Sequence, residues 1–339
     1  MTSPSKAVEM LSVSSFRERS YTVGSMFAGI GGVCLGFRNA GADIIWANEI
    51  DSKACMTYRK NFGSDYLVEE DVRKVNADSI PDIDILTAGF PCQAFSVAGH
   101  RKGFEDERGI LFFEVMRLID AKRPRVVFLE NVKNLVGHDE GRTLKNIIKY
   151  LNDSGYTVEY SVLNTMEYGN IAQNRERIYI VAFRDETDRV GFSFPDAVPL
   201  TNTIHSVIDT SSKKNDSYYY KKDWLHYDNL ESNMTSTDTV YQWRRKYVRE
   251  NKSNVCPTLT ANMGTGGHNV PLILDSYGIR KLTPKECLAF QGFPKTFNFA
   301  EMGNSHMYKQ AGNSVSVPVV QRIAENIISA MKKADSEAS

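Results

Sequence analysis

The sequence has 339 residues, with 42% hydrophobic and 24% charged side chains, an ordinary globular composition that excludes disordered and fibrous classes. Its 41 Lys and Arg balance 41 Asp and Glu, so net charge neither indicates nor excludes a nucleic-acid partner. No apolar run reaches the ~18 residues of a membrane helix, and the first twenty residues lack a signal peptide's apolar stretch, so we expect a cytoplasmic protein with no membrane part.

Strand and helix signals alternate at short intervals from residue 21 to about residue 184. The predicted strands are 21–27, 43–47, 83–88, 126–129 and 178–183. The predicted helices follow residue 32 as far as residue 40 and then cover 52–61, 111–119 and 143–152. Repeated strand–helix units predict an α/β fold, with a doubly wound, mostly parallel sheet and helices on both faces.

The character of the sequence changes after about Phe194. Residues 212–252 contain nine Lys or Arg and eight Tyr or Trp and show no long helical period. They predict a second, smaller, loop-rich domain. An apolar stripe in 318–333 predicts a closing helix that returns to the first domain. The predicted domains are 1–195, completed by 305–339, then 196–284, with 285–304 as a hinge or connector.

Five cysteines occur, and none forms a Cys-x-x-Cys pair, so the sequence predicts no metal site. Their odd number favours free thiols in a reducing cytoplasm. Most free cysteines are small buried hydrophobic residues, which we expect for Cys34, Cys55, Cys256 and Cys287. Cys92 is the candidate exception.

A glycine turn, FAGIGG at 27–32, stands where a strand passes into a helix. Glycines let the backbone approach a ligand, and a helix N-terminus offers free N–H groups. Glu49 ends the next strand, where it could accept two ribose hydroxyls, and Asp71 follows, in place for an adenine amino group. Together they predict a nucleoside-bearing cofactor. The alternatives are a tight turn without a ligand, or a dinucleotide fold, whose Gly-x-Gly-x-x-Gly pattern is missing.

The segment 89–96 (GFPCQAFS) follows a buried strand, so Cys92 falls at the carboxyl edge of the sheet, where open α/β folds bind ligands. A cysteine beside Pro91 on a loop is a poor core residue and a good nucleophile. Glu130 ends the next strand at the same edge. Taken alone, a cysteine in such a loop is more often structural than catalytic, but together with Glu130 it predicts a nucleophile and an acid.

With these residues in place, the sequence resembles the cytosine-5 DNA methyltransferases of bacterial restriction–modification systems. Five segments match in order and spacing across nearly the whole chain: FAGIGG at 27–32, GFPCQ at 89–93, ENV at 130–132, QNRERI at 173–178 and QAGNSV at 310–315. The resemblance implies methyl transfer from S-adenosylmethionine to C5 of a cytosine, with S-adenosylhomocysteine as the product. It also implies protection of DNA from a cognate restriction enzyme.

The resemblance assigns a catalytic group at Cys92, Glu130, Arg175 and Arg177. Cys92 would add to cytosine C6, a protonated Glu130 would hold ring N3 and the exocyclic amine, and Arg177 would steady the ring oxygen. The implied cofactor-binding residues are Phe27, Ala28, Gly29, Gly31, Glu49, Ile50, Asp71, Val72, Gly89, Pro91, Leu111 and Asn313.

A base inside a duplex must be flipped out for this chemistry, so the implied partner is double-stranded DNA. The 196–284 domain would recognise the target, because its aromatic and basic cluster at 241–247 suits a DNA-facing surface. The implied DNA-binding residues are Ser96, Arg101, Lys102, Arg244, Arg245, Thr258 and Gly266. An exposed, solvated charged face is the alternative for the basic side chains.

We expect a monomer encoded by a bacterium or its phage, acting on the same site as an endonuclease without a stable complex. Ser25, Ile50 and Ala98 depart from the family's common residues, the first two in the cofactor site. Two other functions stay open at this point: an RNA methyltransferase on the same scaffold, and a non-catalytic relative that only binds DNA or cofactor.

Overall fold

The computed structural model describes residues 20–338, without 91–108, 245, 252–253 and 266–268. Its strands are β1 (Thr22–Met26), β2 (Asp43–Glu49), β3 (Leu67–Glu69), β4 (Ile85–Ala88), β5 (Val126–Val132), β6 (Thr157–Asn164), β7 (Glu176–Phe183), β8 (Tyr241–Trp243), β9 (Val248–Glu250), β10 (Leu272–Asp275) and β11 (Gly278–Lys281). Its helices are α1 (Gly32–Asn39), α2 (Ser52–Phe62), α3 (Gly109–Lys122), α4 (Arg142–Asp153), α5 (Thr165–Tyr168), α6 (Glu186–Val190), α7 (Tyr227–Asn233), α8 (Pro284–Phe290), α9 (Asn304–Asn313) and α10 (Val317–Glu337).

The larger sheet has the strand order β3-β2-β1-β4-β5-β7-β6. Its strands pair in parallel from β3 to β5, and β7 runs antiparallel to both β5 and β6. The predicted α/β fold with a mostly parallel sheet is confirmed. Because β7 is reversed, its first residues meet the last residues of β5 at the same edge of the sheet.

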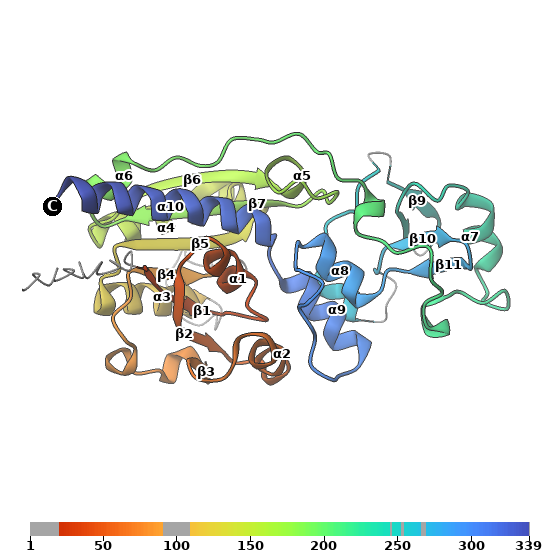
Figure 1. Cartoon of the computed structure of the whole chain (residues 1–339), viewed down its shortest axis with the longest axis horizontal. Coiled ribbons are helices and arrows are strands. Elements are labelled where there is room, and N and C mark those ends of the chain that lie inside the picture. The colour runs from red at the N-terminus through yellow and green to blue at the C-terminus, as the bar shows by residue number, and fades with distance from the viewer. Residues whose placement is uncertain (1–19, 91–108, 245, 252–253, 266–268, 339) are drawn as a thin grey trace, which may run out of the picture.

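Helices cover both faces of this sheet (Figure 1). Side chains of α1, α2 and α10 form one buried cluster with it, and side chains of α3 and α4 form the other. The predicted return of the last helix is confirmed, because α10 packs against α1. At their contact the two backbones are close: a Cβ on Gly36 would lie 2.6 Å from Val320 Cγ1.

Two strands of the large sheet were not predicted, β3 and β6. β3 has only three residues. β6 lies at the edge of the sheet and shows no regular alternation of buried and exposed side chains, which removes the sequence signal of a half-buried strand.

A second, antiparallel sheet of order β11-β10-β8-β9 lies within 196–284. With α7 it encloses a small core of Tyr227, Leu230, Met234, Tyr241, Trp243, Leu272 and Ile279. Between the two sheets lie α8 and α9 (Figure 1). They share a third buried cluster with Ile30 of the glycine turn and with Ile273 of β10, so both the large domain and the small sheet contribute side chains to the core around these two helices.

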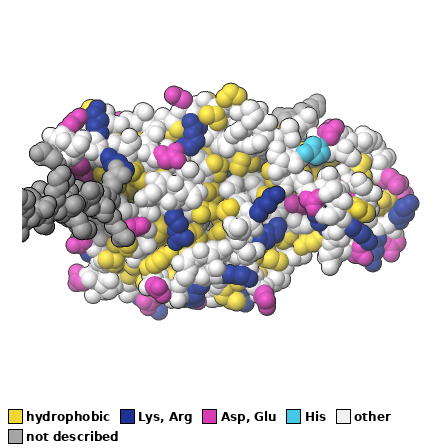
Figure 2. All heavy atoms as spheres, in the orientation of Figure 1, with side chains coloured by type: hydrophobic (Ala, Val, Ile, Leu, Met, Phe, Trp, Pro, Cys, Tyr) yellow, Lys and Arg dark blue, Asp and Glu magenta, His cyan; other side chains and the backbone are white. Residues whose placement is uncertain are grey.

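Acidic and basic side chains are interspersed on the face shown in Figure 2, in keeping with the balanced formal charge. Within the described ranges, no helix is long and apolar enough to cross a membrane.

Candidate functional site

A cavity of about 600 Å³ opens at the carboxyl edge of the large sheet. The lining includes Phe27, Glu49 and Gly89, which end or follow β1, β2 and β4, and Glu130, which lies near the end of β5. Asn313 at the end of α9 lines another side. Four neighbouring strands of the sheet thus each contribute a residue to one cavity. This edge of the sheet is where open α/β folds usually bind ligands.

The turn between β1 and α1 has a left-handed backbone at Phe27 (φ 52°), Gly29 (φ 57°) and Gly31 (φ 91°). A Cβ on Gly31 would lie 2.3 Å from the Phe62 ring, so packing against α2 requires glycine there. A Cβ on Gly29 would meet no atom of the described residues within 4 Å. Because Gly29 has no side chain, its backbone is directly accessible from the cavity.

Glu49 is fixed by three backbone N–H groups. Its Oε2 accepts from Gly29 at 2.8 Å, and its Oε1 accepts from Ile50 and Asp51, each at 2.8 Å. A carboxylate has about four lone-pair sites, so acceptor capacity remains on its cavity side. The carboxylate is both oriented by the turn and able to receive further hydroxyl donors.

Asp71 caps the short 3-10 helix η1 (Val72–Lys74) and accepts from the Arg73 backbone N–H at 3.0 Å. The Arg73 guanidinium also reaches back to it, with Nη2 2.5 Å from Oδ2. This hydrogen bond lowers the pKa of the Asp71 carboxyl. Asp71 and Arg73 both line the cavity, so this carboxylate–guanidinium pair forms part of its wall.

At the edge where β5 ends and β7 begins, Glu130 and Arg177 form an ion pair, with Nε 3.1 Å from Oε1. Both side chains are only 12% exposed. A Cβ on Gly89, two residues before Pro91, would lie 3.7 Å from Glu130 Oε2. The pair therefore lies beside the start of the segment that contains Cys92.

Asn131 was not predicted as a site residue, although it lies in the quoted segment 130–132. Its Nδ2 donates to the Phe90 carbonyl at 2.7 Å, and its Oδ1 accepts from the Val132 N–H at 2.9 Å. The buried amide thereby fixes the backbone at the point where the chain leaves β4 toward Cys92. In the sequence, only the position of Asn131 next to Glu130 indicates this structural role.

Arg175 differs from Arg177 in its surroundings. It is buried, and its guanidinium donates to the carbonyls of Leu259 (2.7 Å), Gly312 (3.4 Å) and Ser314. Among the described residues its Nε has no partner. Burial lowers the pKa of Arg175 to about 9. Its side chain lines the cavity, yet most of its donors bind backbone of three different segments.

Most of the predicted cofactor residues come together at the cavity. The lining includes Phe27, Ala28, Gly29, Glu49, Ile50, Asp71, Val72, Gly89, Leu111 and Asn313. Gly31 is not part of the lining and supports the turn from behind. Ile50 is 63% exposed at the rim.

Of the predicted DNA-binding residues, the structure describes Arg244 and Thr258, and neither lines the cavity. Arg244 is exposed at the end of β8, and Thr258, also exposed, donates to the Asn174 carbonyl at 2.7 Å. Seven predicted residues lie outside the described residues: Pro91, Cys92, Ser96, Arg101, Lys102, Arg245 and Gly266.

The four other cysteines are free and buried, as predicted. Burial raises the pKa of each thiol, for Cys55 to about 12. Over the part of the chain that the structure describes, no cluster of three or more His, Cys, Asp or Glu could hold a metal ion.

A profile of the family described as C-5 cytosine-specific DNA methylase matches residues 21–329. The Type II methyltransferase M.Bsp6I of Bacillus sp. (strain RFL6) is 57% identical over 312 residues, covering 91% of this chain and 99% of that protein. The Type II methyltransferase M.HhaI of Haemophilus parahaemolyticus is 39% identical over 319 residues, covering 90% and 94%.

Solved structures share the fold at low identity. A DNMT2 variant of Spodoptera frugiperda superposes with a TM-score of 0.71 at 18% identity, covering 91% of this chain and all of that one. A putative DNA modification methyltransferase encoded within an E. coli prophage gives 0.67 at 22%, covering 92% and 100%.

Proposed function

The chain belongs to the C-5 cytosine-specific DNA methylase family and is a DNA (cytosine-5) methyltransferase, and from this premise we propose how it works. It flips one cytosine out of a short specific site in duplex DNA and methylates C5 with S-adenosylmethionine. The observation that supports this most is the Glu130–Arg177 ion pair at the cavity edge, beside the start of the Cys92 segment.

The cavity suits S-adenosylmethionine. Glu49 would accept the ribose hydroxyls with its remaining lone pairs, Asp71 would accept the adenine amine, and the bare backbone at Gly29 leaves room for the amino-acid end. When bound, the cofactor would supply the methyl group from a sulfonium. Phe27, Leu111 and Asn313 would complete the walls.

Cytosine C5 becomes nucleophilic when the Cys92 thiolate bonds to C6, because the C5–C6 π electrons then move toward C5 and N3. Glu130 would share a proton with N3, and Arg177 would hold both Glu130 and the ring oxygen. After C5 has taken the methyl group, a solvent water accepts the C5 proton and the C5–C6 double bond re-forms. The Cys92–C6 bond then breaks to release the thiolate, and N3 returns its proton to Glu130. Atoms and charge balance without a metal ion or an oxidant.

Target choice is proposed to reside in 196–284, where Arg244, Arg245, Thr258 and Gly266 would face DNA. Ser96, Arg101 and Lys102 would contact the site from the segment after Cys92. We propose a monomer, a cytoplasmic location, and protection of the same site that a cognate endonuclease cuts. The match to the C-5 cytosine-specific DNA methylase family favours DNA over RNA as substrate.

Covalent trapping tests the proposal. Duplex DNA with 5-fluorocytosine at the target should form an adduct that survives denaturing electrophoresis and requires S-adenosylmethionine, because fluorine cannot leave C5 as a proton does. Cys92→Ser should abolish the adduct, since a serine hydroxyl is far less ionised than a thiol. Glu130→Gln should slow adduct formation while DNA binding persists.

Two outcomes would contradict this function. Trapping that persists in Cys92→Ser would exclude Cys92 as the nucleophile. Methyl incorporation into transfer RNA in place of duplex DNA would favour the RNA methyltransferase. The target itself follows from sequencing methylated sites in DNA of cells that express the protein.

A further inference from the structure

We propose that α8 is a rigid link between target recognition and catalysis, held by a buried polar contact at each end, with Arg280 and Gln173 as its positioning residues. The inference rests on the proposed function, because it concerns how target choice by 196–284 reaches Glu130 and Arg177. α8 has only seven residues and lies between the two sheets (Figure 1).

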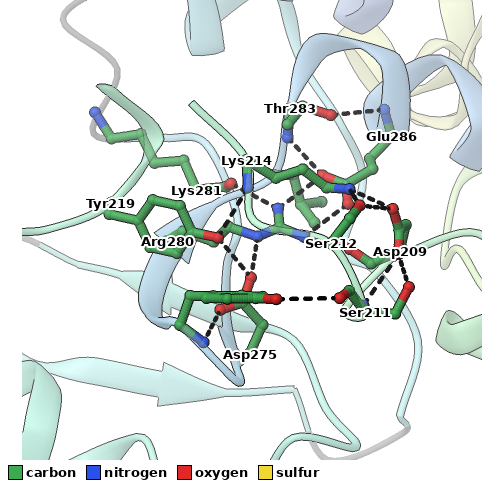
Figure 3. Close-up of polar contacts among 12 residues, drawn as sticks. Asp209, Ser211, Ser212, Lys214, Tyr219, Asp275, Arg280, Lys281, Thr283 and Glu286 are labelled. Carbon is green, nitrogen blue, oxygen red and sulfur yellow. Dashed lines mark hydrogen bonds and ion pairs between the residues drawn. The ribbon is translucent and has the colours of Figure 1, made fainter. Parts of the chain in front are cut away.

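The first contact centres on Arg280 of β11, which is fully buried (Figure 3). Its Nη1 and Nη2 each donate to Glu286 of α8 at 2.8 Å, and its Nε donates to Asp275 of β10 at 2.6 Å. The carbonyls of Lys281 and Asp209 accept its two remaining N–H groups, both at 3.1 Å. All five donors of the guanidinium are therefore used.

Glu286 also belongs to the helix start itself. Its carboxylate accepts from the Thr283 N–H at 2.7 Å, and its own N–H donates to the Thr283 hydroxyl at 3.2 Å, forming a capping box. Burial alone would lower the pKa of Arg280, but the hydrogen bonds that it donates to Glu286 and Asp275 outweigh burial and raise the pKa. The orientation of the small sheet is thus fixed to the first turn of α8 by a charged, bidentate contact.

The second contact lies at the other end of α8 and consists of two fully buried glutamines. Gln173 Nε2 donates to the Phe290 carbonyl at 2.5 Å and to Gln291 Oε1 at 3.1 Å, and Gln173 Oε1 accepts from the Leu259 N–H at 3.3 Å. Gln291 Nε2 donates to the Ala311 carbonyl at 3.0 Å. One amide pair thus joins α8, α9 and the segment next to Thr258.

Gln173 stands four residues before Arg177 on the same approach to β7. Backbone bonds pair this approach with the recognition segment: Cys256 N–H donates to Ala172 (2.7 Å) and Asn174 N–H to Cys256 (2.8 Å). A change in the orientation of the small sheet would therefore reach Arg177, and through it Glu130, along buried contacts. Close-packed, buried contacts of this kind transmit small shifts without a flexible linker.

The matched control is Arg125, which lies in the large domain away from α8. It also makes a bidentate ion pair with a buried carboxylate, 2.6 and 3.0 Å from Asp188. Arg280→Lys and Arg125→Lys each remove a bidentate fork of the same kind, so both should lower the melting temperature. Only the first should alter recognition.

The experiment compares kcat/KM on the cognate duplex with kcat/KM on a duplex that differs by one base pair. The ratio of kcat/KM on the cognate duplex to kcat/KM on the altered duplex should fall about tenfold in Arg280→Lys and in Gln173→Met, which is the usual size of a coupling between two sites. In Arg125→Lys the same ratio should stay within about twofold of the wild-type value. S-adenosylmethionine affinity should be unchanged in Arg280→Lys, because neither Arg280 nor its partners line the cavity.

An unchanged ratio in both α8 variants would overturn the inference, as would an equal fall in Arg125→Lys. Wild-type enzyme is tested first for the 5-fluorocytosine adduct. If it forms none, the proposed function fails and the inference fails with it. If it forms the adduct while the ratios do not move, the inference alone is wrong.

Discussion

Glu49 shows how a single carboxylate can be both a structural and a binding group. Three backbone N–H groups hold it, so it does not need a ligand to be oriented. Preorganisation of this kind reduces the entropy that is lost when a ligand binds.

Glu49→Ala should weaken S-adenosylmethionine binding by roughly 1–3 kcal/mol, the cost of losing a charge-assisted hydrogen bond and leaving its donors unpaired. Isothermal titration calorimetry measures this. The matched control is Glu69→Ala, which removes the carboxylate at the end of the neighbouring strand, 2.6 Å from Arg59 and outside the cavity lining. Unchanged affinity in Glu49→Ala would refute the assignment.

The five cysteines are also expected to differ in reactivity. The thiolate is the reactive form, and burial raises the pKa of Cys34, Cys55, Cys256 and Cys287. Near pH 7.5 these thiols stay protonated and shielded, so iodoacetamide should label Cys92 alone in the folded protein and all five cysteines in urea. Peptide mass spectrometry reads this directly, and native labelling at any of the four would contradict it.

At the scale of secondary-structure elements, the contact between helices α1 and α10 contributes to stability. At Gly36, alanine would gain about 1 kcal/mol in helix propensity but place a Cβ 2.6 Å from Val320 Cγ1 and 3.1 Å from the Gln321 nitrogen. Overpacking costs about 1–3 kcal/mol, so we expect Gly36→Ala to be destabilising, by up to about 2 kcal/mol in urea unfolding. Gly137→Ala is the control, because its Cβ would meet no described atom within 4 Å. Equal stability of the two variants would contradict this expectation, because it would show that the contact between α1 and α10 accommodates the added Cβ.

The elements also show what the sequence can and cannot reveal. The buried strands β1, β4 and β5 follow from apolar runs, and their ends locate Phe27, Gly89 and Glu130. The reversal of β7 leaves no mark on its residues, because Ile178–Phe183 is as apolar as a parallel strand would be. The pairing of Glu130 with Arg177 therefore required the sheet order.

Residues that act between domains are harder still. Arg280 is buried against carboxylates of β10 and α8 and the backbone carbonyl of Asp209, and no local pattern distinguishes it from a surface arginine of a strand. Gln173 lies within a matched segment, yet its amide partners Phe290, Gln291 and Leu259 are distant in sequence. Long-range pairing, which periodicity does not encode, determines both roles.

For the whole molecule, we expect 196–284 to decide which site is methylated. Replacing it with the corresponding module of a relative with a different target should move methylation to that target, as bisulfite sequencing would show. The junction falls between Arg280 and Glu286, so a donor module needs an arginine at the matching place. An active chimera that keeps the original site would exclude this division of labour.

The return of α10 to α1 has a consequence for synthesis of the protein on the ribosome. The cavity is lined by residues of the first strands and by Lys309–Val315, which are added about 260 residues after Glu49. At about 5–20 residues per second, the early strands are synthesised tens of seconds before the residues that complete the cavity and before helix α10, which covers the sheet. A nascent chain therefore has its glycine turn and its Cys92 segment long before it can hold a methyl donor, and a chain truncated before α9 should modify no DNA.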